Sequence, residues 1–457
     1  MNLLVKDKCF YEKIAVIAIP ISLQSMITIG VNMTDTVMVG KFGETSLSAT
    51  ALANQFVNIY QICCMGIAMG ASVLTSRFWG MQDITSLKKT ITLMLRLCIV
   101  LAVLFMLPTI LIPQLLMRMY TNDSVVIAQG VQYFKWMVYC YFLQGMTLTC
   151  TIVLRSVGQV NFPLFTSIGS FFVNILFNYM FIFGKLGVPR MEVEGAGVGT
   201  LIARVFEFSL ICGYFLFVDR KIGYRLKDLR MKCNSLIKDY VSISIPVFVS
   251  DSLLALGTSA VAMVMGRIGT GFVSANSITV VTQQLTTVII QGICHASCIM
   301  TGHTLGHGER EKAQQQAWTF LILGLVVGIL GGGLIKVLSR PIIGLYNITP
   351  ETAQIAGELM DAIAFIVIFQ SMNSILTKGV LRGGGDTKFL MVADIIFLWA
   401  ASLPLGILAG LVWHLDAFWI YVFLKIDQIC KSIWCVFRLR SGKWIKTFSK
   451  EKMNHAQ

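Results

Sequence analysis

Charged side chains are scarce in this chain. Of its 457 residues only 13% are Asp, Glu, Lys or Arg, whereas 56% are hydrophobic and the mean hydropathy is +0.74. A soluble domain of this size would need more polar side chains to cover its surface. Apolar runs of about 20 residues, enough to cross a hydrocarbon core about 30 Å thick, recur along the whole sequence. The composition predicts a polytopic helical membrane protein.

Other absences narrow the class of function. The sequence contains no G-x-x-x-x-G-K-[ST] motif, which excludes ATP hydrolysis within the chain as an energy source. Paired C-x-x-C motifs and clusters of His, Asp and Glu with catalytic spacing are also lacking, so we expect no metal site, no cofactor and no enzyme. The 12 cysteines lie mostly inside apolar runs, where they act as small hydrophobes. The first apolar run has no signal-peptide cleavage site and is expected to remain as a span.

Twelve segments are expected to span the membrane, six in each half. An even number per half starts both halves on the same side, which predicts parallel repeats related by an axis along the membrane normal. Lys and Arg gather in alternate loops, which places both termini in the cytoplasm. This distribution, rather than a nucleic-acid partner, accounts for the net charge of +14. The expected spans are 14–40, 46–76, 91–115, 130–154, 161–184, 195–217, 238–265, 273–302, 316–337, 355–381, 388–411 and 416–437.

The chain repeats itself at half its length. Stretches that begin at Pro20 and Pro246 align without a gap for about 70 residues, and Leu154-Arg155-x-x-Gly158 recurs as Leu381-Arg382-x-x-Gly385. Pro20 lies inside the first span, where its missing N–H should kink the helix. The predicted organisation is an N-lobe of six helices (1–218), a cytoplasmic linker (219–237), a C-lobe of six helices (238–437) and a basic cytoplasmic tail (438–457).

An acid in the first span breaks the symmetry of the repeat. Asp35 lies within Val-Asn-Met-Thr-Asp-Thr-Val-Met, whereas its partner in the second copy is Val261. A carboxylate at membrane depth costs several kcal/mol unless it is paired or reached by water, so Asp35 is a functional candidate. The alternative is an acid near the outer interface that extends to water.

Polar side chains in the fifth and sixth spans complete a candidate cation site. Asn174 and Asn178 are four residues apart and project from one helix face. Thr200 begins the sixth span and adds a hydroxyl. Together with Asp35 they offer hard oxygen ligands suited to Na⁺, and the carboxylate alone could carry a proton. The alternative for the two amides is hydrogen bonding between helices.

The second half offers a weaker set of polar side chains. Asp251, Gln283, Gln284 and Asn373 form a possible second polar site, and Asp361 and Asp394 also lie in apolar runs. Any of these residues is equally compatible with a place at the membrane interface. Lys378 and Arg382, near a cytoplasmic helix end, are expected to contact lipid or the carboxyl ends of helices.

Several motifs resemble the multidrug and toxic-compound extrusion (MATE) transporters. They are Pro20 with Asp35 fifteen positions on, Val-Gly-Lys-Phe-Gly-x-x-Ser-Leu-Ser-Ala at 39–49, Leu154-Arg155-Ser-Val-Gly, and Leu381-Arg382-Gly-Gly-Gly-Asp-Thr. The resemblance covers nearly the whole chain. It implies a V-shaped pair of six-helix lobes around a central cavity. Position by position, the family's N-lobe cation site falls on Asp35, Asn174, Asn178 and Thr200.

The resemblance implies a secondary antiporter that exports amphipathic or cationic compounds, such as drugs and toxins, in exchange for inward Na⁺ or H⁺. Its partners would be small-molecule substrates and membrane lipid, and it would act as a monomer in the bacterial cytoplasmic (plasma) membrane. Where some relatives carry a second acid, this chain has Asn178, which leaves the choice of ion open. The alternative function is a flippase for a lipid-linked oligosaccharide.

Overall fold

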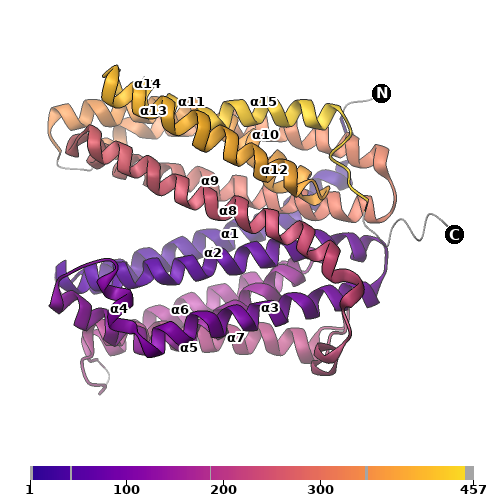
Figure 1. Cartoon of the computed structure of the whole chain (residues 1–457), viewed down its shortest axis with the longest axis horizontal. Coiled ribbons are helices and arrows are strands. Elements are labelled where there is room, and N and C mark those ends of the chain that lie inside the picture. The colour runs from indigo at the N-terminus through magenta and orange to yellow at the C-terminus, as the bar shows by residue number, and fades with distance from the viewer. Residues whose placement is uncertain (1–3, 42–43, 186, 345–347, 448–457) are drawn as a thin grey trace. The chain divides into compact units, whose positions relative to one another are not determined.

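The computed structural model describes residues 4–41, 44–185, 187–344 and 348–447, and in these ranges every regular element is a helix (Figure 1). Eleven helices among the described residues are long and apolar enough to cross a membrane. The end of the predicted tail, residues 448–457, lies outside the described part. The prediction of a polytopic all-helical membrane protein is confirmed.

The helices of the first half are α1 Lys8–Gly40, α2 Glu44–Gly80, α3 Ile84–Leu111, α4 Pro113–Arg118, α5 Ser124–Ser156, α6 Asn161–Phe183, α7 Glu192–Gly213, η1 Tyr214–Val218 and η2 Leu226–Arg230. Those of the second half are α8 Asn234–Ile268, α9 Thr270–Gly306, α10 Arg310–Ile343, α11 Pro350–Ser374, η3 Ile375–Leu381, α12 Thr387–Asp394, η4 Ile395–Ser402, α13 Leu403–Ile407, η5 Leu408–Val412, α14 Ala417–Leu424 and α15 Ile426–Arg440.

The helix boundaries carry the internal repeat well beyond the aligned stretch. α2 begins at Glu44 and α9 begins 226 positions later at Thr270. The same spacing relates the starts of α1 and α8, of α3 and α10, of α5 and α11, and of α6 and α12. In the sixth pair, the starts of α7 and α14 are 225 positions apart, one fewer than in the other pairs. Six helices therefore recur in the same order, as parallel repeats require.

The chain divides into two compact units. One contains residues 1–22, 76–82 and 245–457, and the other contains residues 23–75 and 83–244. We call them the C-bundle and the N-bundle. α1 passes from one unit to the other just after Pro20, and α8 does so beside Pro246. A helix that lacks one backbone hydrogen bond is locally weaker, so proline is a suitable residue at this passage.

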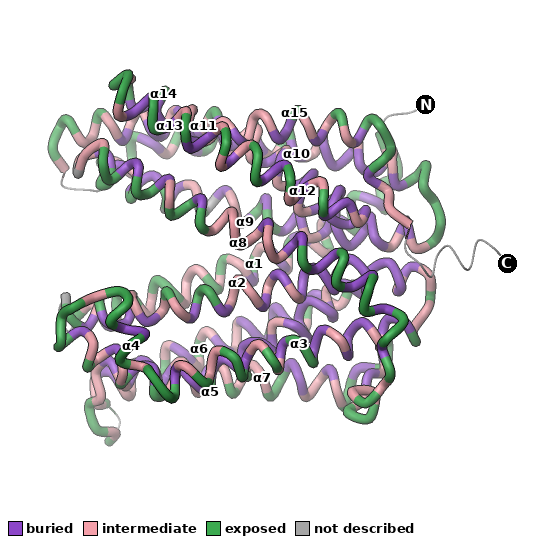
Figure 2. The backbone as a smooth tube through the Cα atoms, in the orientation of Figure 1, coloured by how far each residue is buried: buried purple, intermediate pink, exposed green. Residues whose placement is uncertain are grey.

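Aromatic side chains fill much of the N-bundle core. The rings of Tyr60 and Tyr141 pack edge to face with centroids 5.0 Å apart, and Phe105 packs against both. Tyr60 also donates its hydroxyl to the Tyr141 carbonyl at 2.5 Å, which satisfies a buried polar atom. Buried and exposed residues alternate along most helices (Figure 2). The exposed ones include large apolar side chains such as Leu104, as a lipid-facing surface requires.

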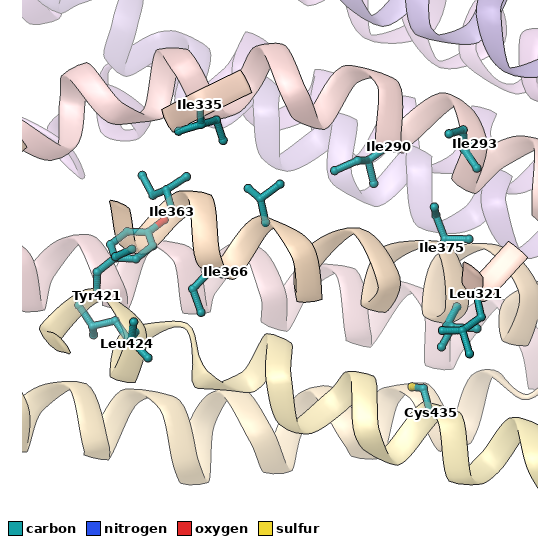
Figure 3. Packing of buried hydrophobic residues seen from close by; sticks show 14 of the residues in the cluster. Ile290, Ile293, Leu321, Ile335, Ile363, Ile366, Ile375, Tyr421, Leu424 and Cys435 are labelled. Atoms are coloured by element: carbon teal, nitrogen blue, oxygen red, sulfur yellow. The ribbon is translucent and has the colours of Figure 1, made fainter. Parts of the chain in front are cut away.

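The C-bundle core is dominated by aliphatic side chains. Figure 3 shows Ile290 of α9, Ile335 of α10, Ile363 of α11 and Tyr421 of α14 in one buried cluster. Gly328 lets α10 approach α11 closely, because an added Cβ would lie 2.7 Å from the Cα of Ile368. Small residues at such crossings allow backbone contact between apolar helices.

Three details differ from the sequence prediction or remain open. The twelfth segment is two helices, α14 and α15, because the chain leaves the helical path at Lys425 (φ −123°, ψ 15°). α8 begins at Asn234, inside the range predicted as linker. Helix α1 is continuous through Pro20, and the predicted kink stays a prediction.

Candidate functional site

A polar cavity of about 340 Å³ lies within the N-bundle. Asp35 of α1, Asn174 of α6 and Thr200 of α7 all line it. The fourth predicted residue, Asn178, is fully buried and is hydrogen-bonded to Asp35. The structure thus brings the four predicted residues together from α1 and from the consecutive helices α6 and α7.

Asn178 is the central hydrogen-bonding residue of the cluster. Its Nδ2 donates to Oδ1 of Asp35 at 2.6 Å and to Oδ1 of Asn174 at 3.2 Å. The i, i+4 spacing on α6 places the two amides in register, as the sequence predicts. The other amide atom, Oδ1 of Asn178, is buried and accepts no hydrogen bond from the described residues. A buried acceptor without a donor is costly. This oxygen faces α7 at Gly199, and Asn178 is not among the residues that line the cavity.

Glycine on α7 allows the close approach of α6. A Cβ added to Gly199 would lie 2.0 Å from Oδ1 of Asn178 and 2.9 Å from its backbone nitrogen. Any side chain at this position would displace Asn178 from its hydrogen bonds. Thr200 follows directly and is half-buried in the cavity wall.

The charges of the cavity leave one negative charge in excess. Besides Asp35, its charged lining residues are Arg204 and Glu207 of α7, which form an ion pair at 2.8 Å. Sequence analysis missed this pair, although two opposite charges three residues apart in an apolar run are a recognisable signal. Because the pair is neutral, the Asp35 carboxylate supplies the net charge of the site.

Further polar side chains of the N-bundle were also missed. Asn54 of α2 lines the cavity and accepts a hydrogen bond from Tyr133 of α5 at 3.2 Å. Gln24 of α1 accepts a hydrogen bond from Arg155 of α5 and donates one to Ser167 at 2.8 Å. Single amides spread over separate helices have no spacing pattern, so only the fold reveals that they meet.

The predicted second polar set does not form one cluster. Asp251 accepts hydrogen bonds from the Arg382 guanidinium at 2.9 and 3.4 Å. Asn373 donates to Gln428 at 2.8 Å. Gln283 donates to Gln370 at 2.9 Å. The remaining member, Gln284, is exposed.

One expectation for the second half is wrong, and an acid whose place was left open proves to be buried. Arg382 is only 4% exposed and pairs with Asp251, rather than contacting lipid or a helix end. Asp394 is likewise buried, and its partner is Lys431 at 3.0 Å. From the sequence, a place at the membrane interface stayed open for Asp251 and Asp394, because each residue was considered alone, whereas burial of a charge requires a partner.

Comparisons with known proteins agree with this architecture. The MatE family model matches residues 20–180 and again 246–429, so its two matches begin at Pro20 and Pro246. The chain is 24% identical over 94% of its length to a probable multidrug resistance protein NorM from Thermotoga maritima, and the match spans 92% of that protein. It is also 24% identical to the uncharacterized transporter YisQ from Bacillus subtilis, covering 93% of both chains.

A solved structure shares the fold. The crystal structure of a mutant of the Vibrio cholerae MATE transporter VcmN superposes with a TM-score of 0.86, covering 95% of this chain and 97% of that one, at 15% sequence identity. The family model covers well over half of the chain, on both copies of the repeat. The chain therefore belongs to the MatE family and is a multi-pass membrane transporter.

Proposed function

We propose that this chain is a secondary antiporter that exports amphipathic, often cationic, small molecules in exchange for inward Na⁺ or H⁺. The observation that carries the proposal is the link from Asp35 to Asn178 at 2.6 Å inside a cavity with one excess negative charge. The multidrug resistance relatives support the class of solute.

The cluster has the ligands for a small cation. Asp35, Asn174 and Thr200 line one cavity, and Asn178 holds the Asp35 carboxylate from behind through its amide nitrogen. Carboxylate, amide and hydroxyl oxygens are hard ligands suited to Na⁺. A proton on Oδ2 of Asp35 would neutralise the same charge and would weaken the hydrogen bond from Asn178 to Oδ1, because a neutral carboxyl group is a poorer acceptor than a carboxylate.

Exchange of charge makes the energetics feasible. One positive charge moving inward across about 100 mV releases about 2.3 kcal/mol. Export of a monovalent cation costs the same electrical work. One-for-one exchange would therefore run on the concentration gradient of the coupling ion alone. We place both termini in the cytoplasm, because Lys and Arg gather in alternate loops. We also propose that the protein acts as a monomer and resides in the bacterial cytoplasmic membrane, the latter because the relatives named above are bacterial.

The test is substrate-driven ion flux in proteoliposomes that contain the full chain. Na⁺ and pH gradients are imposed separately, and uptake of a cationic dye is followed by its fluorescence. Accumulation under one gradient, abolished when that gradient is collapsed, is the expected result. Dye movement that depends on neither gradient would contradict antiport.

A further inference from the structure

A second polar cavity, of about 210 Å³, lies wholly within the C-bundle. We call it the C-cavity. Its lining differs from that of the N-bundle site because basic side chains predominate. The residues on which the argument depends are Asn373, Lys378, Asp394, Lys425, Asp427 and Lys431.

The acids of the C-cavity are already engaged by a basic side chain of the protein. Nζ of Lys431 lies 3.0 Å from Oδ1 of Asp394 and 3.0 Å from Oδ2 of Asp427, and Lys431 is 2% exposed. Ser250 also donates its hydroxyl to Asp394. The ammonium of Lys431 thus occupies the place between the two carboxylates that a free cation would need. A cation site at these acids is disfavoured.

Two basic side chains remain without partners. Lys378 and Lys425 line the C-cavity, and neither ammonium forms a hydrogen bond or ion pair with a residue that the structure describes. Arg382 also lines it, but its guanidinium is engaged by Asp251. An ammonium inside a membrane bundle is costly without a counter-charge. The group of Lys431, Asp394 and Asp427 carries one negative charge, so Lys378 and Lys425 leave the C-cavity with one positive charge in excess. An anionic group would balance it.

Two buried acceptors in the same cavity also lack donors. Oδ1 of Asn373 and Oδ1 of Asp427 are unpaired within the described part of the chain, and these residues are 5% and 1% exposed. Each such oxygen carries a desolvation cost of about 1–3 kcal/mol until a donor reaches it. The cavity therefore offers unpaired donors and unpaired acceptors side by side.

We propose that the C-cavity binds the carboxylate of an exported solute. Lys425 and Lys378 hold the carboxylate, and a hydroxyl or amine of the same solute donates to Asn373 and Asp427. The transport of such a solute rests on the proposed export function. Its binding does not, because binding can be measured without an ion gradient. It extends the solute class from cations to zwitterions and anions.

The binding test uses two forms of one dye. The ethyl ester of a rhodamine is a cation, whereas its free acid carries an added carboxylate. Fluorescence anisotropy measures the binding of both to the purified full chain in detergent. We expect Lys425→Gln to weaken binding of the free acid about tenfold and to leave the ester unchanged. Equal loss for both forms, or no loss for either, would overturn the proposal.

Matched variants separate the site from general effects of charge. Lys443→Gln removes an exposed ammonium outside the C-cavity and should leave binding of both dyes unchanged. Lys378→Gln is the second test variant, should Lys425→Gln fail to fold. A neutral amide is cheaper to bury than an ammonium, so both variants are expected to fold.

Two further measurements test whether the C-cavity recognises a carboxylate or any small anion, and whether a negative result counts against binding or against antiport. Acetate that displaces the free acid from the wild type, at equal ionic strength against chloride, supports recognition of a carboxylate. If chloride displaces it equally well, the cavity recognises any small anion and the proposal is wrong. Asp35→Asn should retain binding of the free acid. A wild type that binds the free acid but shows no ion-coupled transport would count against the proposed antiport alone.

Discussion

Nδ2 of Asn178 lies 2.6 Å from Oδ1 of Asp35 and thereby joins α6 to α1 inside the N-bundle. The same amide nitrogen reaches Asn174 at 3.2 Å. A change in the charge or ligation of Asp35 must therefore alter the hydrogen bonds of α6. This link gives a physical route by which a bound cation or proton would change helix packing.

Asn178→Ala should slow ion-driven export about tenfold or more, because Asp35 loses its donor and the buried Oδ1 of Asn174 loses its partner. The measurement is dye efflux from cells with equal amounts of each protein in the membrane. Asn122→Ala, in an exposed loop, is the control. Efflux by Asn178→Ala at the control rate would show that the amide is dispensable.

Gly199→Ala should destabilise the protein by about 1–3 kcal/mol and lower efflux, because the new Cβ collides with Asn178. Gly213→Ala is the matched control on the same helix, since no atom lies within 4 Å of its added Cβ. Thermal unfolding in detergent and dye efflux are measured for both. Equal behaviour of the two variants would contradict the packing account.

Asp251→Asn should destabilise the protein by about 3–5 kcal/mol, because it leaves Arg382 charged and buried without its partner. The double variant Asp251→Leu with Arg382→Leu should recover much of that loss. The readout is the thermal unfolding midpoint of each protein in detergent. A double variant less stable than Asp251→Asn would show that the pair is not the cause.

The linker supplies a pH-dependent contact outside the membrane-spanning helices. Burial raises the pKa of Asp228, but hydrogen bonds from Lys88 at 3.0 Å and from the backbone of Arg225 together lower it below its usual value. A carboxyl group whose pKa is lowered on folding stabilises the folded state at pH values above its unfolded pKa of 3.8. This stabilisation is lost as the pH falls through the pKa of the folded state.

Asp228→Asn should therefore lower the thermal midpoint at pH 7, and the difference from the wild type should shrink as the pH falls below the unfolded pKa of 3.8. Unfolding of both proteins is followed by intrinsic fluorescence between these pH values. A difference between wild type and variant that stays constant over the range would refute an ionised contact.

Sequence reasoning predicted the parts of the fold that depend on local pattern. Apolar runs predicted the spans. The alignment of Pro20 with Pro246 predicted a repeat, and the starts of six pairs of helices keep nearly the same spacing. Helical spacing also predicted that Asn174 and Asn178 share a face. These signals lie within one segment or between two similar ones.

The contacts that were missed join dissimilar segments. Lys431 meets Asp394 across 37 residues, and Arg382 meets Asp251 across 131. Neither residue of a pair indicates its partner in the sequence, because a single charged residue in an apolar run is equally compatible with a place at the membrane interface. Only the packed bundle shows that these charges are buried in pairs, and that Lys378 and Lys425 have no partner among the residues that the structure describes.

The most direct test of the account compares Asp35→Asn with Asp361→Asn. Asp361 pairs with Lys336 and is 43% exposed in its side chain, so it serves as an acid outside both cavities. The measurement is ion-gradient-driven efflux of a fluorescent cationic dye from cells that express equal amounts of each protein. We expect Asp35→Asn to insert and bind dye but to lose coupled efflux, while Asp361→Asn pumps at the wild-type rate. Wild-type efflux by Asp35→Asn would contradict the central claim that Asp35 couples ion entry to export.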